Sequence, residues 1–346
     1  MTAPLPDVTG PILPPVRPPA TWVAEHLSVL GAESVLCLYS GWGAEARALK
    51  RQGMTVTTAD LLDSSVWWNR AFVADGVVPL SDRRLAKWSK LRKEPDVVKR
   101  FMPWANRYFT PEETIWLGIW YQHIHGSEAT WAERAIGTVA VYWTIRYWLG
   151  WNREELGFKP LPPSAVFRRY VEQAHRMLGR MQGLKPRPHR AEKMAPEAAL
   201  AAFPGELLVC YVPPLGGIEA QGLAQQLCEQ WTGGDPAGKP TAFPTGTLGS
   251  AFGDSEAHLQ AVSRLLSAAD AYRLVALPYQ GEMGDALAAL VAERRPILSR
   301  QELQVPYPGA DGSSIIIQGL LVAGAPAAGE SGLWREPIGA EDEGTE

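Results

Sequence analysis

Gly41-Trp42-Gly43 and Asp60 are the residues of this chain best suited to holding a small ligand. Glycine lets the backbone approach a ligand closely and adopt a positive φ where a turn requires it. An acid at the end of the following strand can accept hydrogen bonds from both hydroxyls of a ribose ring, which is the role we expect for Asp60. The alternative is that the two glycines only make a tight turn between a strand and a helix.

The elements around these residues would bring them together. Residues 34–40 form a short apolar segment that predicts a buried parallel strand. Residues 44–52 predict a helix, and residues 54–59 predict a second strand that ends at Asp60. Strand, glycine turn, helix, strand and acid make up the opening unit of a doubly wound nucleotide-binding sheet. The sequence therefore predicts an α/β fold with a Rossmann-like sheet.

The C-terminal part of the chain predicts the remainder of this sheet. The predicted elements are a strand at 206–211, a helix at 218–231, a strand at 272–277, a helix at 284–294 and an antiparallel pair at 297–305 and 314–322. Residues 233–253 are rich in Gly, Pro and Thr and predict a loop.

A tryptophan-rich segment, residues 64–203, separates the two parts of the predicted sheet and predicts helices. Ten of the fourteen tryptophans lie between Trp67 and Trp151. Tryptophans of this kind stack on nucleic-acid bases when they are exposed, but their spacing here favours a helical core. The residues concerned are Trp104, Trp116, Trp120, Trp143 and Trp148.

We therefore expect four parts along the chain. They are a proline-rich arm (1–20), an α/β domain (21–63 and 204–325), a helical insertion (64–203) and a flexible acidic tail (326–346). No stretch approaches the ~20 apolar residues that cross a bilayer, and three cysteines are too few for a disulfide framework. His123 and His125 would lie on different faces of a helix and make a poor metal pair. The expectation is a reduced, cytoplasmic protein without a metal site.

The net charge of −4 hides two basic segments. Residues 81–107 hold nine Lys/Arg against three Asp/Glu, and residues 159–193 hold nine against two. These segments carry +13 together and the remainder carries −17, a distribution typical of proteins that bind a polyanion. The alternative is two solvated helix faces rich in Lys and Arg. The cationic residues best placed to contact phosphates are Arg83, Arg84, Lys87, Lys90, Arg168 and Arg169.

In this combination the sequence resembles the adenine-specific DNA methyltransferases of the Dam-like class. The stretch from Val35 to Ala44, with an aromatic, a small residue and Gly-x-Gly after a strand, is similar to that family's cofactor loop. The phrase Tyr108-Phe109-Thr110-Pro111 and the order of the parts also match. The resemblance implies S-adenosylmethionine as cofactor, double-stranded DNA as partner and the insertion as target-recognition domain. The implied cofactor-binding residues are Tyr39, Ser40, Gly41, Gly43, Asp60 and Leu61.

The catalytic motif departs from the family pattern. Members end the strand after the insertion with Asp-Pro-Pro-Tyr, in which the acid and a proline carbonyl hold the target amine and the aromatic stacks on the flipped base. Here the matching residues are Val212, Pro213, Pro214 and Leu215. The proline carbonyls remain, whereas the acid and the aromatic are absent. The N-terminal arm also lacks the lysine- and glycine-containing phrase of the family.

Three functions remain open at this point. The first is a divergent enzyme that methylates the exocyclic amine of adenine in DNA. The second is a catalytically inactive methyltransferase-fold protein that binds DNA and serves as a regulatory subunit beside an active methyltransferase or restriction partner. The third is a methyltransferase for another substrate, which would need no adenine clamp.

Overall fold

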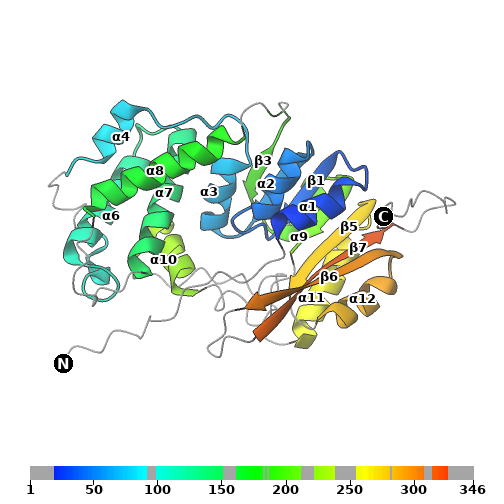
Figure 1. The fold of residues 1–346 in the computed structure, drawn as a ribbon. Helices are drawn as coiled ribbons and strands as arrows, with labels where there is room; N and C mark the ends of the chain where they lie inside the picture. The colour runs from blue at the N-terminus through cyan, green and yellow to red at the C-terminus, as the bar shows by residue number, and fades with distance from the viewer. Residues whose placement is uncertain are drawn as a thin grey trace, which may run out of the picture.

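The computed structural model describes residues 19–91, 99–150, 161–181, 184, 187–211, 222–237, 255–280, 283–307 and 314–325. Over these residues, seven strands form one mixed sheet and are accompanied by eleven α-helices (Figure 1). The predicted acidic tail and nearly all of the predicted proline-rich arm lie outside the described residues.

The sheet has the strand order β3-β2-β1-β4-β5-β7-β6. Strands β1 to β5 are parallel wherever they pair, and β7 is antiparallel to both β5 and β6. Apart from the added antiparallel β7, this is the order of a doubly wound nucleotide-binding sheet. The prediction of an α/β protein is confirmed, and the strand order is compatible with the predicted Rossmann-like sheet. The strands are β1 Ser34–Leu38, β2 Thr55–Asp60, β3 Arg190–Lys193, β4 Leu207–Cys210, β5 Leu274–Gln280, β6 Ile297–Tyr307 and β7 Ser314–Gly324.

Both faces of the central strands are buried, as the unbroken apolar sequence of β1 and β4 requires. Val35 and Cys37 face a core that includes helices α1 (Ala20–Ser28) and α2 (Ala44–Arg51). Leu36 and Leu38 face the opposite core. Residues of the helices α9 (Pro196–Ala202), α11 (Ser255–Ala268) and α12 (Gly284–Ala292) complete that second core.

The other helices gather beside the sheet (Figure 1). Their side chains form one core rich in aromatic residues. Thr110 and Thr130 each form a capping box with the glutamate three residues later, which fixes where α6 and α7 begin. Four of the five predicted core tryptophans are buried, and Trp143 packs against them, so the core prediction is confirmed. The elements are α3 Asp63–Phe72, α4 Asp82–Trp88, the 3-10 helix η1 Met102–Trp104, α6 Pro111–His125, α7 Trp131–Leu149, α8 Pro163–Gly179 and α10 Gly222–Gly233.

Two elements differ from the sequence prediction. Residues 64–203 were expected to be helical, but β3 lies within them and pairs with β2. Strand β3 reads Arg-Ala-Glu-Lys and contributes one small apolar side chain, because an edge strand needs little apolar surface. Helix α11 was not predicted, whereas the antiparallel pair of β6 and β7 is confirmed.

Candidate functional site

The predicted cofactor loop has an unusual backbone. Tyr39, Gly41 and Gly43 all adopt a positive φ, of 49°, 53° and 61°. A positive φ is strained for tyrosine and free of strain for glycine. A Cβ atom at Gly43 would overlap the side-chain oxygen of Asn69, so glycine is required there by both conformation and space. Gly43 thus lets the loop after β1 pack directly against Asn69 of α3.

Asp60 lies against this loop, at the carboxyl end of the neighbouring strand. The Gly41 N–H donates to Asp60 Oδ2 at 3.1 Å, and the Leu62 N–H donates to Asp60 Oδ1 at 3.0 Å. The side chain is 5% exposed. A carboxylate held by fixed donors keeps one orientation, which suits recognition of a ribose diol. Such a carboxylate could accept hydrogen bonds from the hydroxyls of a ribose ring. Leu61, the residue after Asp60, is half-buried.

Asn69 of α3 donates hydrogen bonds to the loop, and the sequence did not predict this role. Its Nδ2 group donates toward Ser40 Oγ at 2.9 Å, the Gly41 carbonyl at 3.0 Å and the Ser65 carbonyl at 2.8 Å. The side chain is fully buried. Because a primary amide has only two hydrogens, the three acceptors share them. The signal in the sequence was a lone asparagine within an aromatic helix.

Trp42, between the two glycines, connects the loop to the helical part. Its ring stacks on Trp68 with centroids 4.7 Å apart, and the Arg146 guanidinium lies 3.9 Å from the ring centroid. The indole N–H donates to Gln225 Oε1 at 3.2 Å. Trp42 therefore packs the loop against three helices, α3, α7 and α10.

Glu229 of α10 is a buried carboxyl group that contacts the start of α3. Glu229 accepts hydrogen bonds from the Asp63 N–H at 3.0 Å and the Ser64 N–H at 2.7 Å, and so caps the N-terminus of α3. Burial raises the pKa of Glu229 to about 7, with the charges of Asp63 and Asp60 adding to the shift. Asp63 pairs with Lys193 at 2.6 Å. Sequence reasoning missed Glu229, because a cap supplied by a distant helix leaves no local pattern.

The predicted catalytic residues Val212, Pro213, Pro214 and Leu215 lie outside the described residues. The strand that leads to them is described. Cys210, at the end of β4, pairs with Leu38 at the end of β1, so the chain leaves β4 beside the cofactor loop. Tyr211 follows and is buried.

The two predicted basic clusters are brought together. Arg168 Nε of α8 donates to Ser89 Oγ at the end of α4 at 3.1 Å, and the Leu80 N–H donates to His175 Nε2 of α8 at 2.9 Å. Helices α4 and α8 therefore present their cations on adjoining surfaces. Four of the six predicted cations are exposed, namely Arg83, Lys90, Arg168 and Arg169.

Two cations of the α4 cluster are engaged within the protein. Arg84 Nε lies 2.8 Å from Glu133 Oε1, and Lys87 pairs with Glu128. Both are half-buried. A cation in an ion pair offers a phosphate less attraction than a free one, so the exposed arginines of α8 contribute more to the positive surface than Arg84 and Lys87 do.

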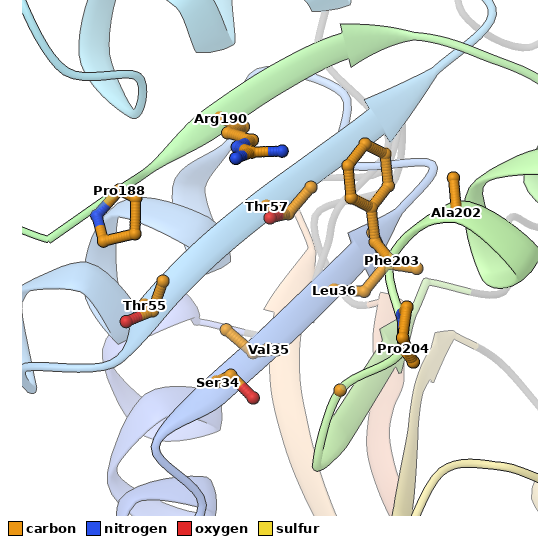
Figure 2. A pocket seen from close by; sticks show the side chains of 11 residues that line it. Ser34, Val35, Leu36, Thr55, Thr57, Pro188, Arg190, Ala202, Phe203 and Pro204 are labelled. Atoms are coloured by element: carbon orange, nitrogen blue, oxygen red, sulfur yellow. The ribbon is translucent and has the colours of Figure 1, made fainter.

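A pocket of about 260 Å³ lies away from all of these residues, beside the amino ends of β1 and β2 (Figure 2). Its walls include Thr55, Thr57 and Arg190, whose guanidinium lies 5.9 Å from the Phe203 ring centroid. None of the predicted cofactor residues lines it. The pocket is therefore a separate feature from the cofactor loop, which lies at the opposite ends of the strands.

No protein-family model matches the chain, and no curated protein matches it. Within the described residues, no helix is long and apolar enough to cross a membrane. The same residues contain no group of three His, Cys, Asp or Glu side chains placed to hold a metal ion, and the three cysteines are free and buried.

Proposed function

We propose that this chain is a methyltransferase-fold protein that binds S-adenosylmethionine and acts on the exocyclic amine of adenine in DNA. The observation that carries the proposal is the hydrogen bond from the Gly41 N–H to Asp60 Oδ2. It joins two of the residues that the sequence predicts to bind the cofactor. The strand order is compatible with the Rossmann-like sheet that the resemblance implies, which supports the same proposal.

In this proposal, the loop, Asp60 and Pro213 each have a defined role. S-adenosylmethionine supplies an electrophilic methyl group when it is bound. Asp60 would accept hydrogen bonds from the ribose, and the glycine loop would let the cofactor approach the backbone. The Pro213 carbonyl, with bound water, would accept hydrogen bonds from the target amine in place of the missing acid.

The helical part supplies a surface for DNA in this proposal. Helices α4 and α8 adjoin, and their exposed cations include Arg83 and Arg169. Contacts of this kind with phosphates position a duplex without reading its sequence. The aromatic core beneath them gives the two helices a fixed spacing.

Calorimetric titration with S-adenosylmethionine tests the cofactor assignment. We expect micromolar binding to the unmodified chain, loss of binding in Gly43→Ala, and unchanged binding in Gly179→Ala. The second variant is the matched control, because a Cβ at Gly179 meets nothing within 4 Å. Absence of heat with the unmodified chain, or equal effects of the two substitutions, would overturn the assignment.

A second function, an inactive DNA-binding or regulatory subunit, is favoured by the replacement of the acid and the aromatic by Val212 and Leu215. A hydrogen bond to a charged group contributes about 1.5–3 kcal/mol, and stacking on a base about 1–3 kcal/mol. Their joint loss lowers a rate by several orders of magnitude at about 1.4 kcal/mol per tenfold. Transfer of a labelled methyl group to DNA by Val212→Asp/Leu215→Tyr, but not by the unmodified chain, would support the second function over the first.

A further inference from the structure

A chain of contacts between aromatic rings and arginines links α6 to α3. The Arg100 guanidinium lies 4.6 Å from the centroid of the Tyr121 ring, and the Tyr121 and His125 rings stack with centroids 4.6 Å apart. His125 meets Trp67 edge to face at 6.5 Å, and the Arg70 guanidinium lies 4.9 Å from the Trp67 centroid. We refer to these five residues as the Trp67 stack.

The Trp67 stack differs from the aromatic core in its exposure. Trp68, the next residue along α3, is buried, whereas Trp67, Tyr121 and His125 are half-buried and Arg100 is exposed. Tyr121 and His125 also meet the buried Trp231 edge to face, at 5.8 and 5.3 Å. The rings are thus supported by the core and still offer surface to solvent.

One part of the Trp67 stack lies on α3, the helix that follows Asp60. Trp67 follows Asp63 by four residues on α3, so the two side chains share one face of the helix about 6 Å apart along its axis. Asp63 is the third residue after Asp60, the acid that contacts Gly41. The Trp67 stack is therefore carried in part by the helix that directly follows the strand ending at Asp60.

The charges around the Trp67 stack favour an anionic partner. Arg70 and Arg100 flank the rings, and Arg134 lies close to His125, whereas Asp63 is the acid that faces His125. Burial lowers the pKa of His125 to about 4, with Arg134 and Arg100 acting in the same direction and Asp63 opposing them. His125 is therefore a neutral ring at neutral pH and adds no charge to the Trp67 stack.

We infer that the Trp67 stack binds unpaired nucleobases, with Arg70 and Arg100 meeting the adjoining phosphates. Aromatic rings beside cations are a general means of binding single-stranded nucleic acid, because every base offers a flat face for stacking. The inference rests on the proposed function, in which a base must leave the duplex to reach the methyl donor. It adds a place for that unpaired base or its neighbours on α3 and α6.

The test is fluorescence anisotropy with a labelled single-stranded oligonucleotide and, separately, a duplex hairpin. We expect Trp67→Leu to weaken binding of the single strand about 5- to 150-fold, the range for loss of one stacked base. Binding of the duplex hairpin should weaken less than binding of the single strand. Trp131→Leu is the matched control, because Trp131 is 47% exposed at the start of α7 and belongs to no part of the Trp67 stack. Unchanged binding by Trp67→Leu, or equal losses in both variants, would overturn the inference.

A second pair of variants covers the case in which Trp67→Leu fails to fold. Arg100 and Arg107 are both exposed and each lies over a tyrosine ring, at 4.6 and 4.9 Å. We expect Arg100→Gln to weaken single-strand binding and Arg107→Gln to leave it unchanged, and the reverse order would refute the inference. Calorimetry with S-adenosylmethionine on the unmodified chain separates the two proposals. Loss of single-strand binding in Arg100→Gln without any cofactor binding would leave the Trp67 stack supported and the methyltransferase proposal refuted.

Discussion

Replacing Gly43 with alanine would place a methyl group on the side-chain oxygen of Asn69. The backbone at Gly43 has a φ of 61°, and an L-residue in this left-handed region costs about 1–2 kcal/mol. Moving the Asn69 amide also weakens its hydrogen bonds to Ser40, Gly41 and Ser65. Each such bond contributes about 0.5–1.5 kcal/mol net. Strain and one lost hydrogen bond together predict a loss of about 1.5–3.5 kcal/mol in the free energy of unfolding.

Urea unfolding followed by tryptophan fluorescence measures this loss. Gly179→Ala provides the control, since its new methyl group would lie in open space. A double-mutant cycle sharpens the result, because Asn69→Ala removes the atom that the methyl group meets. We expect the combined variant to lose about 1 kcal/mol less than the sum of the two single losses. A loss below about 0.5 kcal/mol in Gly43→Ala, in the range of ordinary surface changes, would refute this explanation of the loop.

Three further predictions concern helix capping, pH and DNA. The pKa of Glu229 is raised to about 7, so the folded protein binds more protons than the unfolded chain between about pH 4.5 and 7, and stability falls as the pH rises through that window. Glu229→Gln leaves one oxygen to accept the two backbone N–H groups, so the variant should be less stable than the unmodified chain at pH 5. Because only the unmodified chain loses stability as the pH rises, this difference in the free energy of unfolding should shrink by pH 7.5 in urea unfolding. Thr130→Ala removes the cap of α7 and should cost about 1 kcal/mol in the same assay. In titrations of duplex DNA against salt, Arg169→Gln should reduce the slope of log K against log salt by about 0.9, whereas Arg84→Gln, whose arginine already pairs with Glu133, should change it less.

Each of these has a clear contrary result. A stability difference for Glu229→Gln that is constant from pH 5 to pH 7.5 would show that Glu229 has an ordinary pKa. An unchanged unfolding midpoint for Thr130→Ala would show that the capping box contributes nothing. An effect of Arg84→Gln on the salt slope as large as that of Arg169→Gln would show that the ion pair to Glu133 does not withhold Arg84 from phosphates.

Local patterns were sufficient to predict the first half of the candidate site. The apolar segment before Tyr39, the glycines and the β-branched strand before Asp60 each act within a few residues, and the contact between Gly41 and Asp60 follows from parallel pairing of β1 with β2. Strand β3 escaped prediction because its stability comes from pairing with β2 rather than from its own four residues.

The residues that were missed act over long separations. Asn69 reaches the loop across 28 residues, and Glu229 reaches Ser64 across 165. The indole of Trp42 reaches Gln225 across 183 residues. Such contacts depend on how α3 and α10 pack beside the sheet, which no window along the sequence records. The Trp67 stack has the same origin, because it joins two helices of the aromatic core.

The amide of Gly43 offers the most direct test of cofactor binding at the loop. Trp42-Gly43 is the one Trp-Gly pair in the sequence, so labelling tryptophan carbonyls with ¹³C and glycine amides with ¹⁵N isolates a single NMR signal. This N–H donates to the Ser40 carbonyl at 2.8 Å, within the turn that would face the cofactor. We predict that S-adenosylmethionine shifts this signal saturably at micromolar concentration. A signal that stays in place at millimolar S-adenosylmethionine would contradict the proposed function.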